Sequence, residues 1–135
     1  MRKGLAIITG ADGGMGTEIT RAVALAGYSV VMACYNAEKA EVKRKLLIEE
    51  TGNADIMVMS IDLSSLASVN AFACRMLERG DRLDLLMNNA GTMETGRRLT
   101  EDGLERTVSV NYVGPYLLTR RFLPLMGEGS RVVNM

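Results

Sequence analysis

The glycine-rich segment at residues 9–16 has the residue types and spacing best suited to bind an anion. Gly10, Gly14 and Gly16 form a G-x-x-x-G-x-G pattern that follows a short apolar run and precedes a helical one. Glycine permits a tight turn and removes the Cβ that would block a phosphate, while the N–H groups that begin the next helix face the anion. We therefore expect a pyrophosphate here, held by residues Gly10, Asp12, Gly13, Gly14, Met15 and Gly16. The alternative is a turn that merely contains glycine.

Asp12 is the one residue of this loop whose chemistry opposes a phosphate, because like charges repel. We expect its carboxylate to point away from the anion or to cap the following helix. The loop is not a P-loop, since no Lys-Ser or Lys-Thr pair follows the glycines.

Polar residues also follow two later apolar runs. Asp62 ends the run at residues 56–61, and Asn88-Asn89-Ala90-Gly91 ends the run at residues 83–87. The carboxyl ends of parallel strands meet at one edge of a sheet, where open α/β folds bind their ligands. Asp62 could instead cap a helix that begins near Ser64, and Asn88 could serve structure, since a buried amide needs hydrogen-bond partners.

The elements that would position these residues alternate regularly. Strands are predicted at residues 5–8, 29–34, 56–61, 83–87 and 131–135. Between them we expect helices that end at Gly27, that run from an Asn36 cap to about residue 50, and that begin at Ser64. A fourth, long helix capped by Thr100 would be kinked by Pro115. In the second helix Val42, Leu46 and Leu47 should face inward. This order predicts an α/β protein with a doubly wound parallel sheet of five strands in three α/β/α layers.

Composition excludes several other kinds of chemistry. The chain has 135 residues, the size of a single domain over 1–135, with zero net charge and no histidine. Zero charge argues against nucleic-acid or anionic-membrane partners, and the missing histidine removes His-based triads and His-ligated metals. The two cysteines form no CxxC pair, so we expect no metal and two buried free thiols in a reducing cytoplasm. No apolar stretch is long enough to span a membrane.

Several motifs in register resemble the short-chain dehydrogenase/reductase family over the whole chain. They are Thr9-Gly10-x-x-x-Gly14-x-Gly16, Asp62-Leu63, Asn88-Asn89-Ala90-Gly91, Asn111-x-x-Gly114 and Arg131-Val132-Val133-Asn134. The resemblance implies a Rossmann-like fold that binds NAD or NADP. It also implies an oxidoreductase that transfers hydride between the nicotinamide and a small alcohol or carbonyl substrate.

The resemblance also assigns roles to individual residues. Asp62 would contact the adenine, with the backbone of Leu63 beside it. Asn89, Ala90 and Gly91 would pass under the adenine-proximal ribose, while Asn88 mostly ties strands together. Asn111 would support a water-linked proton relay at a helix irregularity, which Gly114 and Pro115 fit.

The choice between NADP and NAD depends on the end of the second strand, at Cys34-Tyr35-Asn36. The absence of a carboxylate at Cys34 favours NADP, because nothing there would repel a 2′-phosphate. The absence of an arginine at Tyr35 leaves NAD open. Tyr35 could stack on the adenine, and Asn36 could bond the ribose.

The family's catalytic Ser and its Tyr-x-x-x-Lys pair have no counterpart at the expected places. The string Tyr35-x-x-x-Lys39 follows the second strand, at the adenosine end. We therefore expect an N-terminal portion, truncated before these residues and inactive by itself. The alternative is a non-catalytic dinucleotide-binding or interaction module. An exposed sheet edge should make the chain a homo-oligomer or prone to aggregation.

Overall fold

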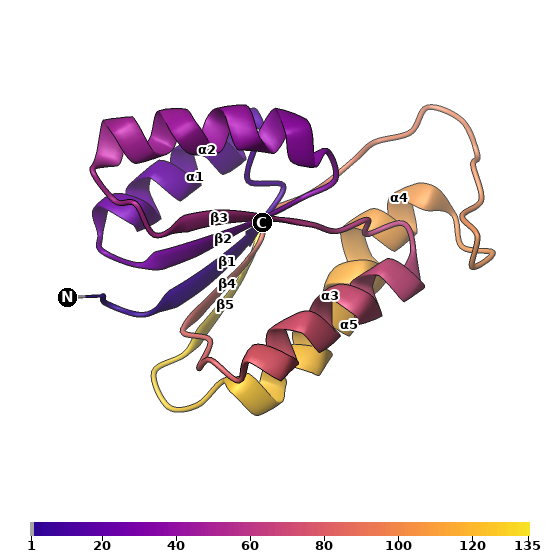
Figure 1. Ribbon diagram of the computed structural model, residues 1–135. Helices are drawn as coiled ribbons and strands as arrows, with labels where there is room; N and C mark the ends of the chain where they lie inside the picture. The colour runs from indigo at the N-terminus through magenta and orange to yellow at the C-terminus, as the bar shows by residue number, and fades with distance from the viewer. Residues whose placement is uncertain (1) are drawn as a thin grey trace.

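The computed structural model describes residues 2–135 as one twisted parallel sheet between two layers of helices (Figure 1). The strands are β1 (Leu5–Thr9), β2 (Ser29–Cys34), β3 (Ile56–Ser60), β4 (Leu85–Asn88) and β5 (Arg131–Asn134). They lie in the order β3-β2-β1-β4-β5, and every pair is parallel. The doubly wound α/β prediction is therefore confirmed.

The helices divide between the two faces of the sheet. Figure 1 shows α1 (Gly14–Leu25) and α2 (Ala37–Thr51) on one face, and α3 (Leu66–Arg79) and α5 (Gly114–Phe122) on the other. Short helical segments complete the chain: α4 (Arg106–Val108), the π-helix η1 (Ser109–Val113) and the 3-10 turn η2 (Leu123–Leu125). No helix within residues 2–135 combines the length and apolar character needed to cross a membrane.

The central strand β1 is buried on both faces, as its uninterrupted apolar run predicts. Ile7 packs into the core under α3 and α5, which contains the paired rings of Phe72 and Phe122. Ile8 points the other way, into the core under α1 and α2 with Met32 and Leu47. The period-2 alternation of one strand thus builds both cores.

Two helix predictions are wrong in detail. Ser65, not Ser64, caps α3, because its hydroxyl oxygen accepts from the N–H of Ser68. Val42 and Leu46 of α2 are exposed. The inward positions of α2 are Ala40 and Leu47. The predicted cap at Asn36 is confirmed by the N–H of Lys39, which donates to the side-chain oxygen of Asn36.

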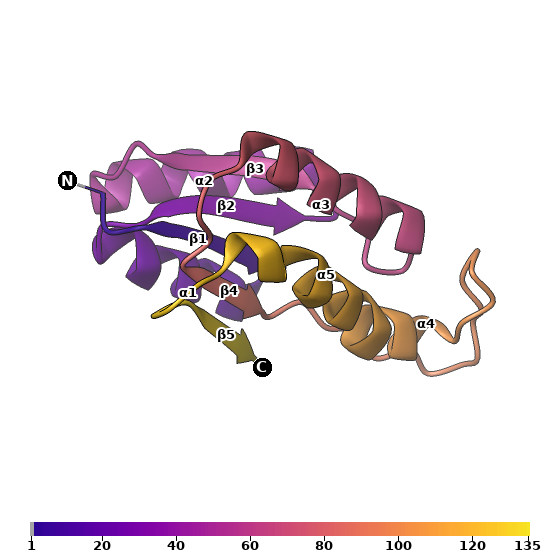
Figure 2. The ribbon, with the colours of Figure 1, turned by 90° about the horizontal axis from the view of Figure 1, so that it is seen from below.

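The segment between β4 and α4 extends away from the sheet (Figures 1 and 2). The helix that follows starts at Arg106, later than the predicted cap at Thr100. Thr100 forms a turn closed at Gly103, and Glu105 caps α4 through the N–H groups of Thr107 and Val108. The carboxylate of Asp102 instead accepts from the N–H of Leu66, the first residue of α3. Asp102, which looks like a first-turn residue of a local helix, therefore makes its hydrogen bond to a helix that is distant in sequence.

Pro115 stands in the first turn of α5, which continues directly from α4 and η1, so it lies inside a helical run over residues 106–122 as predicted. The irregularity predicted near it is present as η1, which contains Asn111. Both cysteines are free, yet only Cys34 is buried; Cys74 is exposed, contrary to the prediction.

Candidate functional site

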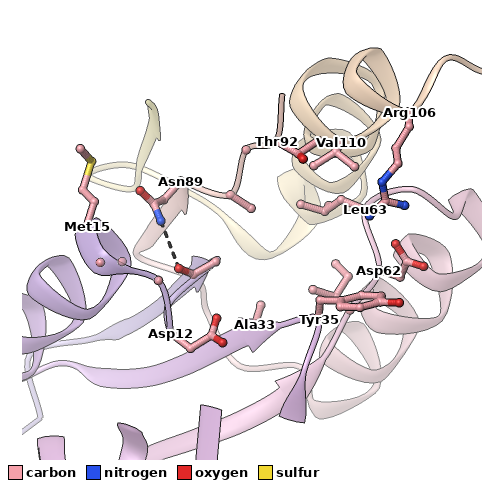
Figure 3. Close-up of a pocket in the computed structure, with 17 residues that line it drawn as sticks. Asp12, Met15, Ala33, Tyr35, Asp62, Leu63, Asn89, Thr92, Arg106 and Val110 are labelled. Carbon is pink, nitrogen blue, oxygen red and sulfur yellow. Dashed lines mark hydrogen bonds between the residues drawn. The ribbon is translucent and has the colours of Figure 1, made fainter. Parts of the chain in front are cut away.

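An open cleft of about 550 Å³ lies at the carboxyl ends of the strands, beside β1, where the strand order reverses. All the predicted cofactor-binding residues line it except Asn36. Figure 3 shows the side chains that the glycine loop and the ends of β2, β3 and β4 contribute. The topology thus brings together residues that are far apart in the sequence.

The three glycines of the loop meet different surroundings. Gly10 has φ +62°, and a Cβ there would lie 2.9 Å from the Cα of Ala90. A Cβ on Gly16 would lie 2.0 Å from the carbonyl oxygen of Gly10, inside any allowed contact. A Cβ on Gly14 would meet no atom within 4 Å and would enter open space where Gly14 lines the cleft. Gly14 therefore leaves room for a ligand at the N-terminus of α1.

The segment after β4 holds this loop in place. The side-chain amide of Asn89 donates to the carbonyl oxygen of Thr9 at 3.1 Å and to that of Gly10 at 3.3 Å. Figure 3 shows one dashed hydrogen bond from Asn89 to the glycine loop. The N–H groups of Asn89 and Ala90 both donate to the hydroxyl of Thr9, at 3.1 and 3.0 Å. The side chain of Asn89 is thus a support for the loop, whatever ligand the loop binds.

Asp12 does not cap α1, which starts after Gly13 without a side-chain cap. Its carboxylate points toward the end of β2 (Figure 3). The pKa of the Cys34 thiol is raised to about 12, first by burial and then by the negative charge of Asp12. Asp12 therefore adds negative charge to the part of the cleft where β2 carries no carboxylate of its own.

The end of β3 supplies a carboxylate and a free backbone donor. One oxygen of Asp62 accepts from the N–H and the hydroxyl of Ser64, at 2.9 and 2.6 Å. These bonds shape the turn before α3, so both the binding and the structural interpretations of Asp62 have support. The buried Leu63 has a backbone N–H with no hydrogen-bond partner among residues 2–135. A buried donor without a partner is costly, so a bound acceptor would fit there.

The residues after β2 differ in their relation to the cleft. Tyr35 lines it and is 71% exposed as a residue, so its ring is open to stacking by a planar group. The side-chain oxygen of Asn36 is engaged in capping α2 at 3.0 Å and does not line the cleft. Its predicted contact to a ribose gains no support from this arrangement.

A second open cavity of about 550 Å³ adjoins the first, lined by residues from β4, β5, η1 and α5. Asn88 lies at its edge and donates to the hydroxyl of Thr119 at 3.1 Å and to the side-chain oxygen of Asn134 at 2.9 Å. These bonds tie β4 to α5 and β5, which is the structural interpretation of Asn88. Its own buried side-chain oxygen has no partner among residues 2–135.

Asn111 also lines this second cavity, from η1. Its side-chain amide donates to the carbonyl of Thr92, and its side-chain oxygen accepts from the N–H of Thr92, each at 2.8 Å. Pro115 has no N–H, so the backbone carbonyl of Asn111 lacks the donor that a regular helix would supply four residues later. The bond that a regular helix would place at this carbonyl is therefore missing.

Sequence reasoning missed some lining residues of the first cleft: Ala33, Ile61, Thr92, Arg106 and Val110. Arg106 and Val110 are four residues apart, a spacing that places side chains on one helical face. That spacing could have indicated that both side chains face the cleft. The prediction missed it because it placed the start of the helix at Thr100 rather than after Glu105. No cluster of carboxylates and thiols able to hold a metal ion occurs within residues 2–135.

The residues present fit a dinucleotide. The N-terminus of α1 with its open Gly14 suits a pyrophosphate. The free N–H of Leu63 suits an acceptor atom of a base, and the carboxylate of Asp62 suits its amino group. Sheet order, crossovers and cleft position together define an α/β protein of the Rossmann type.

Comparison with known proteins identifies the family within that class. The family model described as short chain dehydrogenase matches residues 4–135, and the chain belongs to that family. Human dehydrogenase/reductase SDR family member 13 is 40% identical over 98% of this chain and 35% of its own length. Human retinol dehydrogenase 13 is 37% identical over 96% of this chain and 40% of its own length.

A solved structure agrees with this assignment. The crystal structure of a metagenomic short-chain oxidoreductase in complex with NADP superposes with a TM-score of 0.79 at 29% identity, covering 92% of this chain and 57% of that one. The chain thus spans less than half of the two curated relatives and little more than half of this structure.

Proposed function

We propose that the chain is the NAD(P)-binding part of an oxidoreductase that transfers hydride between a nicotinamide and a small alcohol or carbonyl substrate. The observation that carries the proposal is Gly14, whose missing Cβ leaves open space at the N-terminus of α1, in the same cleft as the free N–H of Leu63. The name of one relative, retinol dehydrogenase 13, supports an apolar alcohol or carbonyl as the substrate class.

The bound nicotinamide would supply the hydride chemistry, and the chain's own residues would bind and orient it. Met15, Asn89, Ala90 and Gly91 line both cavities, so a ligand that extends from one to the other must cross them. At the far side, the backbone carbonyl of Asn111 would accept a hydrogen bond from water and so hold one step of a proton relay.

We further propose that these 135 residues alone bind the dinucleotide but transfer no hydride. Tyr35 lines the first cleft but not the second, so Tyr35 and Lys39 stand at the wrong end for the reaction. Tyr116 lines the second cavity, but Arg120 occupies the position four residues later, where a lysine would be needed. This observation also favours the second candidate function, a non-catalytic dinucleotide-binding module.

Titration calorimetry of the purified chain with NAD and NADP tests the proposal, combined with a search for NAD(P)H turnover on alcohols and carbonyls. We expect binding without turnover. Absence of binding to either dinucleotide would refute the proposed function. Steady turnover by the chain alone would refute the claim that it is inactive.

For the cofactor we propose NADP over NAD, because β2 ends in the buried thiol of Cys34 rather than in a carboxylate. Solved relatives in complex with NADP support this choice. The carboxylate of Asp12 opposes it. We therefore expect Asp12→Asn to raise the affinity for NADP relative to NAD by about tenfold, as removal of one nearby charge allows. An unchanged ratio of the two dissociation constants would show that Asp12 is remote from the 2′-position.

Two further proposals concern the surroundings of the protein. β5 pairs with β4 alone within residues 2–135 and its residues are largely exposed, which supports a homo-oligomer or an aggregating chain. Size-exclusion chromatography tests this, and a stable monomer would contradict it.

The unpaired cysteines support a cytoplasmic location, which cell fractionation of the tagged protein would check.

A further inference from the structure

Arg106 brings a positive charge into the first cleft. It is the first residue of α4, and none of the other residues within 2–135 that line this cleft is cationic. Asp12 and Asp62 line the same cleft with negative charges. The charge of Arg106 is therefore opposite in sign to the other charges that line the cleft.

The Arg106 side chain is held in place by its neighbours. Its Nε donates to Glu94 at 2.9 Å, and the N–H of Glu94 donates to the hydroxyl of Thr107 at 3.3 Å. Its backbone N–H donates to the carbonyl of Arg98 at 2.8 Å. The side chains of Arg106 and Glu94 are only 29% and 20% exposed. These contacts orient the guanidinium before any ligand arrives.

The Nε of Arg106 bonds to Glu94, whereas its two terminal amino groups make no hydrogen bond within residues 2–135. Figure 3 shows the guanidinium turned toward the cleft, on the side where Asp62 and Leu63 lie. Leu63 and Val110 give this part of the cleft an apolar wall. A planar group inserted here would meet apolar contacts, the free N–H of Leu63 and the guanidinium together.

We propose that Arg106 is an adenine-binding residue, whose guanidinium covers the base that Asp62 and Leu63 recognise at its edge. Glu94 is its positioning residue. This inference rests on the proposed function and adds a binding residue outside the motifs of the glycine loop. An aromatic base attracts a guanidinium over its face. A 2′-phosphate does not fit beside Asp62, because the carboxylate would repel it.

The test measures the affinity of the full 135-residue chain for AMP, adenosine 2′,5′-bisphosphate and inorganic pyrophosphate by titration calorimetry. For Arg106→Ala we expect about five- to tenfold weaker binding of both adenine nucleotides, in equal proportion, which is the size of a cation–π contact. Pyrophosphate, which has no base, should bind as it does to the wild type. Glu94→Gln should weaken the adenine nucleotides in the same direction, since Arg106 then loses its anchor.

Arg98→Ala provides the matched control. Arg98 also pairs with Glu94, at 3.7 Å, but is exposed and does not line the cleft, so its removal should leave all three affinities unchanged. Unchanged AMP binding by Arg106→Ala, a loss confined to the bisphosphate, or an equal loss for pyrophosphate would each overturn the role of Arg106. A wild-type chain that binds none of the probes would refute the proposed function itself.

Discussion

Substituting alanine for Gly14 should separate the stability of the fold from its ability to bind a dinucleotide. Gly14 is the first residue of α1, and its added Cβ would meet no atom within 4 Å. Alanine is the better helix former, by about 0.5–1 kcal/mol in a helix interior and less at a first position. Gly14→Ala should therefore leave the free energy of unfolding unchanged or slightly raised.

The same Cβ would occupy the space in which a pyrophosphate approaches the N–H groups of α1. Loss of one hydrogen bond to a charged group costs about 1.5–3 kcal/mol, which corresponds to roughly tenfold to 100-fold weaker binding. Gly16→Ala is the contrasting variant, because its Cβ would lie 2.0 Å from the Gly10 carbonyl oxygen. That oxygen also accepts from Gly13 and Asn89, so a forced shift should cost about 1–3 kcal/mol of stability.

Urea unfolding and titration calorimetry with NADP, run on the wild type and both variants, give the two quantities independently. We expect Gly14→Ala to retain stability and lose affinity, and Gly16→Ala to lose both. If Gly14→Ala bound NADP as tightly as the wild type, no pyrophosphate would lie at the N-terminus of α1. If it instead unfolded more easily, the space beside Gly14 would not be open.

Two other expectations follow from titratable groups. Burial tends to raise the pKa of Asp84, but the N–H of Leu5 and the guanidinium of Arg82 outweigh burial and hold the pKa below its usual value. A lowered pKa stabilises the fold above the ordinary carboxyl range and loses that contribution as pH falls, so unfolding free energy should decline below about pH 4 more gently in Asp84→Asn than in the wild type. Equal slopes would contradict this. Burial and Asp12 raise the pKa of Cys34 to about 12, so iodoacetamide at about pH 8 should label the exposed Cys74 and spare Cys34 in the native chain, as peptide mass spectrometry would show.

The sheet could be predicted from sequence because its signal is local. Apolar runs such as the one from Leu5 to Ile8 form strands buried on both faces, and the glycines after β1 require a turn into a helix. The cleft then follows from topology alone, since parallel strands bring their carboxyl ends to one edge. Most of the predicted binding residues line it for that reason.

The segment between β4 and α4 could not be predicted in the same way, because its signals serve distant contacts. Thr100 and Asp102 resemble the start of a helix, yet Asp102 binds the N–H of Leu66 on α3. Arg106 is the first residue of α4, and its N–H bonds back to the carbonyl of Arg98 in the loop. This loop conformation, which no local pattern predicts, places Arg106 at the cleft. The orientation of Asp12 could not be predicted either, because no local sequence pattern indicates that its side chain lies near Cys34.

The three motif glycines, equivalent in the sequence pattern, have three different physical reasons to be glycine. Gly10 allows the loop after β1 to approach Ala90, one of the residues that line both cavities. Gly16 allows the first turn of α1 to lie against the carbonyl of Gly10. A Cβ on Gly14 would meet no atom within 4 Å, so a steric conflict with the rest of the chain cannot explain this glycine. Glycine at a helix position where alanine would be more stable is accounted for by a ligand, and the position at the N-terminus of α1 makes that ligand an anion.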